Sequence, residues 1–227
     1  MSKSDLKLDW CSHAAAKYAV EHWHYSKSMP AGTKVRVGVW ERDVFIGVLI
    51  FSSGSTINIG SPYGLKQIEV CELTRVALNH HVSAVSRILA IALKMVSRQS
   101  IGLKLVVSYA DQNKDHHGGI YQASNWVYVG ESVGASCLEM TSGEVLHRRS
   151  AFERYGTSSV EKLGATRIQG LGKHKYLYPL TPEMQGKIEP LRKPYPKRAI
   201  AKGSPQSNAD NGGAVPTRSL QPLAKTE

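Results

Sequence analysis

A strand–helix–strand pattern in the middle of the chain constrains the fold most. Residues 68–78 (IEVCELTRVAL) alternate apolar and polar side chains as a strand does, and a second strand is expected over 103–110 (LKLVVSYA). Between them, residues 86–98 (SRILAIALKMVSR) place apolar side chains at helical spacing on one face. Two strands joined by one helix usually run parallel in the same sheet. The sequence therefore predicts an α/β fold with a parallel or mixed sheet.

Further elements flank this unit. Residues 13–25 favour a helix that starts after Ser12, and 35–40 with 44–51 read as the two strands of a hairpin. Four later segments also have the apolar pattern of strands: 127–132, 137–140, 145–148 and 173–180. From about residue 192 the composition changes to Pro, Gly, Ser, Asn and Lys, which cannot bury enough surface to become ordered. We expect one domain over 1–191 and a disordered basic tail over 192–227.

The formal net charge is +11, from 29 Lys and Arg against 18 Asp and Glu. From residue 192 onward there are seven cations and two acids, so the tail carries +5 and the domain keeps +6. Such an excess indicates an anionic partner, in the first place nucleic acid, because displacing counterions from phosphates favours binding. Solubility alone is the alternative explanation.

The cysteines and the apolar segments indicate the cellular compartment of the protein. Cys11, Cys71 and Cys137 are odd in number and far apart, so they fit neither a disulfide framework nor a paired zinc motif. The sequence has no run of eighteen apolar residues, the length needed to cross a membrane. Its N-terminus lacks the apolar part of a secretory signal. These features predict a cytoplasmic protein without a membrane partner; they leave the oligomeric state open.

A dense polar cluster follows the second strand, at residues 108–126 (SYADQNKDHHGGIYQASNW). Open α/β sheets place catalytic groups at the carboxyl ends of their strands, so Asp111 is a candidate general base. A carboxylate that only caps a turn is the alternative. Gly118 and Gly119 would let the backbone approach a bound molecule closely.

The order of the expected elements resembles that of the GNAT acyltransferases, with a mixed central sheet flanked by helices. Two segments carry the resemblance: VALNHHVSAVSRILAIALK at the start of the central helix, and YQASNW before VYVG. In that family the first segment holds the pyrophosphate of coenzyme A on free helix amides. A tyrosine in the second segment protonates the leaving thiolate, which suits a phenol with a pKa near ~10.

The GNAT resemblance implies an acyl donor such as acetyl-coenzyme A, held by Ser83, Ser86 and Arg87, with Tyr121 as the acid. The family's Gly-rich pattern is absent from residues 82–87. Capping of the helix by Ser83 or Ser86 explains these serines as well as phosphate binding does. Asn125 and Trp126 replace the Gly and Phe of the family's second motif.

A second resemblance covers more of the chain, through HWHYSKSMPAG, SPYGLKQIEVCELTRVAL, VSRILAIALK, SYADQNKDHHGGIYQASNW and KHKYLYPL. These segments resemble the phage Mom family of DNA modification proteins, which is regarded as an offshoot of the GNAT fold. The resemblance implies conversion of adenine in double-stranded DNA to N6-(carbamoylmethyl)adenine, which protects phage DNA from host restriction. The family's active-site residues fall on His24, Tyr25, Asp111 and Tyr121, with Ser86 at the helix start.

This chemistry assigns tasks to the side chains. The N6 amine of adenine is a poor nucleophile, so Asp111 would take its proton and His24 would move a proton near neutral pH. A base inside a duplex is out of reach, so base flipping is expected, with aromatic rings holding the base. The residues expected to contact DNA or the flipped base are Trp23, Tyr25, Lys27, Arg75, Asn125, Trp126, Lys173 and Lys175.

The product implied by the Mom resemblance limits the donor. It joins N6 to a methylene carbon, which transfer of an acetyl group cannot do, so the small-molecule donor stays unidentified and a redox metal such as iron is a hypothesis. Asp111 or Asp115 with His116 and His117 would supply a two-histidine, one-carboxylate set. Neighbouring histidines in an extended chain point apart, so that set requires a bend near Gly118.

Three other functions remain open at this stage. One is a GNAT-type acyltransferase that modifies an amine of a small molecule or protein, and another is a noncatalytic DNA-binding protein. The third is a histidine–metal nuclease, which DHHGG alone indicates.

Overall fold

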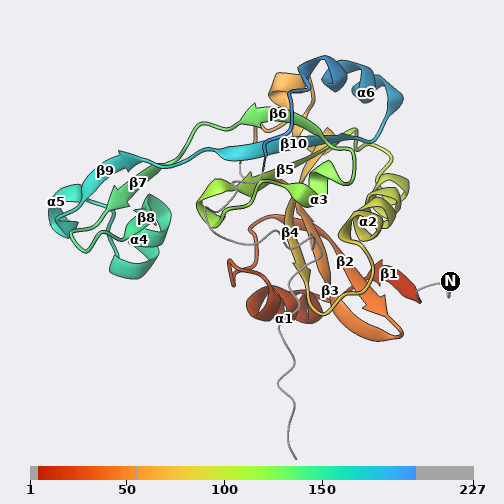
Figure 1. Cartoon of the computed structure of the whole chain (residues 1–227), viewed down its shortest axis with the longest axis horizontal. Coiled ribbons are helices and arrows are strands. Elements are labelled where there is room, and N and C mark those ends of the chain that lie inside the picture. The colour runs from red at the N-terminus through yellow and green to blue at the C-terminus, as the bar shows by residue number, and fades with distance from the viewer. Residues whose placement is uncertain (1–4, 55, 198–227) are drawn as a thin grey trace, which may run out of the picture.

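The computed structural model describes residues 5–54 and 56–197 and confirms the α/β prediction (Figure 1). Its main sheet has seven strands in the order β1-β2-β3-β4-β5-β10-β6. β4 and β5 run parallel, and the other neighbouring strands of this described sheet are antiparallel. The strands are β1 (Leu6–Trp10), β2 (Thr33–Glu41), β3 (Val44–Ser52), β4 (Val70–Leu78), β5 (Leu105–Asp111), β6 (Val127–Glu131) and β10 (Lys173–Pro179).

Helices cover both faces of the main sheet. α2 (Val85–Gln99) and α3 (Gly119–Gln122) pack on one face, and α1 (His13–Trp23) and α6 (Pro182–Ile188) pack on the other. We call these the α2 face and the α1 face. Side chains of β5 alternate between them, with Val106 and Ala110 in the α2 core and Leu105 and Val107 in the α1-face core. Short 3₁₀ turns lie at Ser61–Tyr63, Gln67–Glu69, Gln112–Lys114 and Glu189–Leu191.

The parallel pair stops before either strand ends. β4 and β5 pair from Val70 with Leu105 to Leu73 with Ser108, and both strands then continue without pairing to each other. At the same point β4 has a bulge, because Phe51 pairs with Leu73 whereas Ile50 pairs with Arg75. The extra residue, Thr74, turns the following side chains over. Arg75 therefore points to the α1 face, and its neighbour two positions on, Ala77, packs against α1.

Residues 132–172, which we call the arm, form a small unit beside the main sheet (Figure 1). The arm holds a three-stranded sheet with its own small core around Leu138, Ala151 and Ala165. The predicted strands at 137–140 and 145–148 lie here. The elements of the arm are β7 (Ser136–Glu139), β8 (Val145–His147), β9 (Thr166–Gln169), α4 (Arg148–Tyr155) and α5 (Val160–Leu163).

The first residues of the predicted tail belong to the folded domain. The Lys193 amide donates to the Tyr128 carbonyl (2.8 Å), and the Tyr195 hydroxyl donates to the Trp126 carbonyl (2.7 Å). The Tyr195 ring packs against the main core, because an aromatic side chain supplies apolar area that the rest of this polar segment lacks. Residues 198–227 lie outside the described residues. None of the described helices is long and apolar enough to cross a membrane.

Candidate functional site

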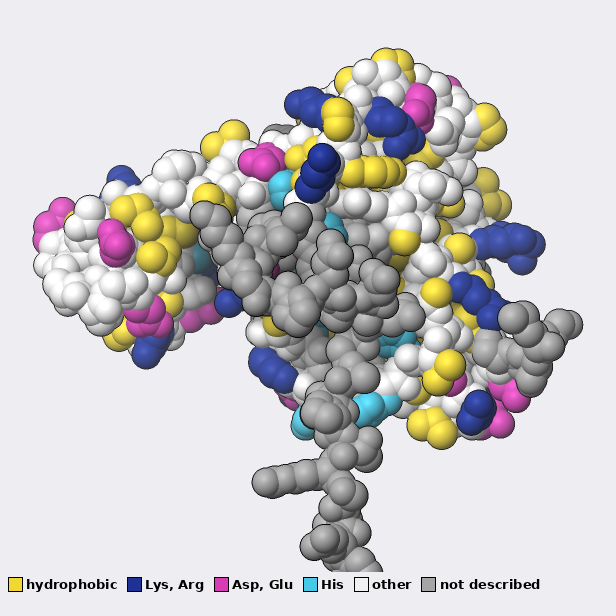
Figure 2. All heavy atoms as spheres, viewed as in Figure 1, with side chains coloured by type: hydrophobic (Ala, Val, Ile, Leu, Met, Phe, Trp, Pro, Cys, Tyr) yellow, Lys and Arg dark blue, Asp and Glu magenta, His cyan; other side chains and the backbone are white. Residues whose placement is uncertain are grey.

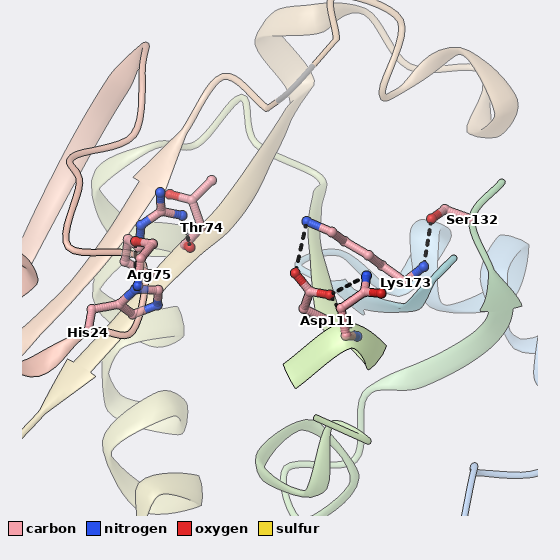
Figure 3. Close-up of polar contacts among 8 residues, drawn as sticks. His24, Thr74, Arg75, Asp111, Ser132 and Lys173 are labelled. Atoms are coloured by element: carbon pink, nitrogen blue, oxygen red, sulfur yellow. Dashed lines mark hydrogen bonds and ion pairs between the residues drawn. The ribbon is translucent and has the colours of Figure 1, made fainter. Parts of the chain in front are cut away.

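Asp111 ends β5 on the α1 face, opposite Lys173 at the start of β10. One carboxylate oxygen accepts from the backbone (3.0 Å) and side-chain (3.1 Å) amides of Asn113, so Asp111 caps the turn that follows. The other oxygen lies 3.6 Å from Lys173 Nζ (Figure 3). The turn-capping bonds and the ion pair with Lys173 therefore use different oxygens of one side chain.

The residues just after α1 approach Asp111 from a second element. The Tyr25 ring meets the His116 ring edge to face, with centroids 5.2 Å apart, and Tyr25 is 49% exposed. Burial of part of this phenol and the nearby charge of Asp111 raise the pKa of Tyr25, and the positive charge of Arg75 opposes them. Tyr25 is thus within electrostatic reach of both charged residues.

Arg75 ties the α1 end to β4. Its Nε donates to the Ser28 carbonyl (3.2 Å), and its Nη1 donates to the Thr74 carbonyl (2.8 Å). Figure 3 shows Arg75 beside His24, with Asp111 and Lys173 forming a second group on β5 and β10. The bulge at Thr74 is what brings this guanidinium to the α1 face.

His24 is nearly buried, with 8% exposed. The Ser26 amide (3.1 Å) can only donate, so His24 Nδ1 accepts and the neutral ring carries its proton on Nε2. Burial, and then the charges of Arg75, His116 and Lys27, lower the pKa of His24 to about 4. His24 is therefore neutral at pH 7, and the predicted role of a group that titrates near neutrality does not fit this environment.

Tyr121 lies on the other side of the sheet from Asp111. Ser108 Oγ is 2.7 Å from the Leu73 carbonyl and 2.7 Å from the Tyr121 hydroxyl. The carbonyl takes the serine proton, so the tyrosine donates to the serine oxygen. Ser108 and Asp111 are three positions apart and so point to opposite faces.

The surroundings of Tyr121 are those of a core residue. Its ring packs on Trp126 and Tyr176, with centroids 5.0 and 5.1 Å away, and 7% of the residue is exposed. Burial raises its pKa to about 12. The resemblance to the Mom family groups this phenol with Asp111 in one active site, whereas strand alternation places the two side chains on opposite faces of the sheet. In the structure Tyr25 is a half-exposed phenol on the side of Asp111.

The junction before α2 holds an internal carboxylate. Glu41, at the end of β2, accepts from the amides of Val82 (2.8 Å) and Ser83 (2.7 Å), one on each oxygen. Burial raises the pKa of Glu41, but hydrogen bonds from the Ser83 side chain and these amides outweigh it and hold the pKa below its usual value. The amides of Val82 and Ser83 are thus occupied by an internal carboxylate, and a pyrophosphate could use them only after Glu41 moves. Ser86 and Arg87 lie in the first turn of α2.

The predicted metal set is not assembled. Among the described residues, no three His, Cys, Asp or Glu side chains are grouped so that they could hold a metal ion. His116 lies against Tyr25, whereas the His117 carbonyl accepts from the Tyr176 hydroxyl (2.5 Å). Asp115 takes a left-handed conformation (φ 55°) that ends the turn after β5, and it points to solvent. The local turn geometry therefore separates the ligands that the sequence grouped.

Two of the residues expected to hold a base are structural. Trp126 is fully buried, and Asn125 adopts a left-handed conformation (φ 58°) that turns the chain into β6. Trp23 packs on Tyr18 and Phe45 beside α1, with ring centroids 5.5 and 5.8 Å away. Base stacking on Trp126 would require the core to open.

The basic residues expected to meet DNA are distributed around the site. Lys173 lies beside Asp111, and Lys27 donates from Nζ to the His22 carbonyl (2.7 Å) next to the α1 end. Lys175 shares the α1 face with Lys173 and lies 5.0 Å from the Tyr63 ring centroid and 6.0 Å from that of Tyr109.

Sequence reasoning did not identify Glu41, Ser108 or Tyr63. Ser108 had a local signal, because it is the polar residue within the apolar strand LVVSYA. Glu41 had none, since its partners are 41 and 42 positions away. Tyr63 joins Lys175 only through the folding of the loop between β3 and β4.

Residues 5–197 match the model of the Mom protein family. The chain belongs to the Mom family. A curated member, methylcarbamoylase mom of Escherichia phage Mu, is 26% identical over 162 residues. The match covers 69% of this Mom chain and spans 66% of the length of that relative, slightly less than two thirds.

The chain is also similar to solved structures. Spermidine N-acetyltransferase from Vibrio cholerae, in complex with CoA and spermine, is 10% identical over 78% of this chain and 96% of that one (TM-score 0.44). FeeM, an N-acyl amino acid synthase from uncultured soil microbes, is 10% identical over 82% of this chain and 95% of that one (TM-score 0.47). Because both TM-scores are below 0.5, these similarities do not indicate what the chain binds.

Proposed function

We propose that this chain is a DNA-modification enzyme that converts adenine in double-stranded DNA to N6-(carbamoylmethyl)adenine, with phage or prophage DNA in a host cytoplasm as its substrate. The observation that carries the proposal is that a Mom-family chain presents the Asp111–Lys173 ion pair on the α1 face, with Tyr25 within electrostatic reach of both Asp111 and Arg75. An acid–base group, an exposed aromatic ring and two cations are what a flipped base and its phosphates require.

The reaction needs one proton acceptor on the protein. N6 forms a bond to the methylene carbon of a carbamoylmethyl donor, while the bond from that carbon to its leaving group breaks and the leaving group departs with the electron pair. The N6 proton passes to the carboxylate of Asp111. The oxygen of Asp111 that lies beside Lys173 is the one available for this step, because the other caps the Asn113 turn.

Tyr25 is the side chain best suited to hold the extruded adenine. It is half-exposed, whereas the rings of Trp126 and Tyr121 are enclosed in the core. An aromatic ring stabilises a flipped base by stacking, at about 1–3 kcal/mol per base. Arg75 and Lys173, on the same face of the sheet, would meet the phosphates of the distorted strand.

The donor is a small molecule that carries its leaving group on the methylene carbon. An acyl-coenzyme A would have to displace Glu41 to place its pyrophosphate on the amides of Val82 and Ser83. Direct acyl transfer from it would also join N6 to a carbonyl carbon and so would not yield the proposed product. We therefore assign no step to coenzyme A or to iron.

Expression of the chain in bacteria, followed by digestion of their DNA to nucleosides and mass spectrometry, tests the function. The expected result is a deoxyadenosine heavier by one carbamoylmethyl group, together with DNA that resists restriction enzymes. Unmodified DNA with an acetylated amine product would instead indicate an acyltransferase. Tight duplex binding without any modified nucleoside would indicate a noncatalytic DNA-binding protein, and nicked DNA a nuclease.

A further inference from the structure

The arm begins and ends next to the candidate site. Ser132 and Lys173 pair at its base: the Ser132 amide donates to the Lys173 carbonyl (2.8 Å), and the Lys173 amide donates to Ser132 Oγ (3.0 Å). The side chain of the same lysine reaches Asp111 (Figure 3). The arm therefore projects from the edge of the sheet at which the candidate site lies.

The arm exposes large hydrophobic side chains although its own core is small. Phe152 is 59% exposed and Tyr155 is 42% exposed, both on α4. Arg148, Phe152 and Tyr155 are spaced i, i+4 and i+7, so they form one stripe along the helix, and the buried Ala151 borders this stripe. Figure 2 shows hydrophobic and charged side chains exposed together on the arm.

Arginines lie along and beside this stripe. The Arg154 guanidinium lies 5.2 Å from the centre of the Tyr155 ring, and Arg148 and Arg149 begin the helix. Arg149 and Arg154 also have acidic partners, Glu153 at 3.6 Å and Glu144 at 2.9 Å. Exposed ion pairs of this kind contribute little, so phosphates can replace the carboxylates.

We propose that the α4 stripe is a second DNA-binding surface, which grips the duplex to one side of the target adenine while the α1 face holds the flipped base. The proposal rests on the proposed function for the choice of partner. Arginines meet phosphates, and an exposed aromatic ring on a projecting element can insert between base pairs, which helps to open the stack. Together the two surfaces would hold the duplex on both sides of the distortion.

Duplex binding by the full-length protein tests this proposal separately from catalysis. Fluorescence anisotropy on a labelled duplex of about 30 base pairs over a range of KCl concentrations would compare wild type, Arg148→Glu/Arg149→Glu, Phe152→Ala and a control, Lys94→Glu/Arg98→Glu. The control reverses two exposed charges on α2, away from the site. All the changed side chains are exposed, and circular dichroism checks that each variant folds.

The arm variants should bind more weakly than the control. Reversing two arginines should reduce the slope of log K against log [salt] by about 2 and weaken binding by about 10-fold or more at physiological salt. Phe152→Ala should weaken binding by about 10-fold with the salt slope unchanged. Hydroxyl-radical footprints should shorten on one flank only.

Two results would overturn the proposal. One is that the arm variants match the control in affinity, salt slope and footprint. The other is a wild-type dimer by light scattering that the arm variants convert to a monomer, because the stripe would then bind a second copy of the chain. A protein that binds duplex through the arm but never modifies adenine would leave this surface intact and refute the proposed function alone.

Discussion

The exposure of two tyrosines decides which of them can contact a DNA base. Tyr25 is half-exposed beside Asp111 and Arg75, whereas the hydroxyl of Tyr121 is engaged with Ser108 in the core. The sequence indicated both tyrosines through the resemblance to the Mom family. It could not separate them, because their exposure depends on strand alternation and on the position of α3.

Substituting each tyrosine should separate the two roles. Tyr25→Ala should lower adenine modification by about 10-fold or more, because a stacking ring is lost, with the melting temperature nearly unchanged. Tyr121→Phe should lower the free energy of unfolding by about 1 kcal/mol, since a buried hydrogen bond is lost, and should leave modification close to wild type. A Tyr121→Phe protein of wild-type stability that modifies no adenine would restore the role of catalytic acid to Tyr121.

His24 should make the fold sensitive to mild acid. The unfolded histidine takes up its proton near pH ~6.5, but the folded one does so only at a pKa of about 4. The stability that neutral His24 contributes is therefore complete above pH ~6.5 and is lost as the pH falls from there towards 4, by about 3 kcal/mol.

The His24→Asn variant should lack this loss, because asparagine can accept from the Ser26 amide without titrating. Chemical denaturation at several pH values measures the difference between the two proteins. His22→Asn, at an exposed position on the last turn of α1, should behave like wild type. Parallel pH profiles for wild type and His24→Asn would contradict the assignment.

At the scale of elements, the bulge in β4 turns Arg75 to the α1 face, and Glu41 fixes the segment before α2. Periodicity predicted β4, α2 and β5 well, because their apolar side chains repeat regularly. It did not predict the bulge at Thr74, which depends on the pairing with β3. It also missed α4, where Ala151 is the one buried residue and the aromatic side chains are exposed, so no apolar face repeats at helical spacing.

Glu41 should stabilise the segment that leads into α2. Glu41→Ala leaves two amides without their acceptor, each at about 1–3 kcal/mol, so the free energy of unfolding should fall by about 2–5 kcal/mol. Glu41→Gln keeps one acceptor oxygen and should lose roughly half as much. Thermal or urea unfolding measures both, with Glu139→Ala at an exposed position of β7 as the control. A Glu41→Ala protein as stable as that control would show that solvent satisfies these amides.

At the scale of the whole molecule, the composition change at residue 192 does not coincide with the end of the fold. Residues 192–197, which composition assigned to the tail, contact the domain, because Lys193 and Tyr195 hydrogen-bond to the carbonyls of Tyr128 and Trp126. The arm also escaped prediction as a separate unit: its short strands were expected, but their grouping depends on contacts between β7 and β9 that no local pattern encodes.

Two truncations should locate the end of the domain. A chain that ends at residue 191 loses the Lys193 and Tyr195 contacts and should have a free energy of unfolding lower by about 3 kcal/mol, from the two lost hydrogen bonds and the exposed aromatic area. A chain that ends at 197 should unfold like the full-length protein. Equal melting temperatures for the two truncated chains would place the end of the domain before 192.

The most direct test of the central claim, that Asp111 is the base for adenine N6, compares Asp111→Asn with Asp115→Asn in bacteria. Asparagine keeps the shape of each side chain but cannot take a proton, and Asp115 lies in the same loop, exposed to solvent. The measured quantity is the fraction of deoxyadenosine modified, at equal protein level and equal duplex affinity. We expect Asp111→Asn to abolish modification and Asp115→Asn to retain it. Wild-type modification by Asp111→Asn would contradict the claim.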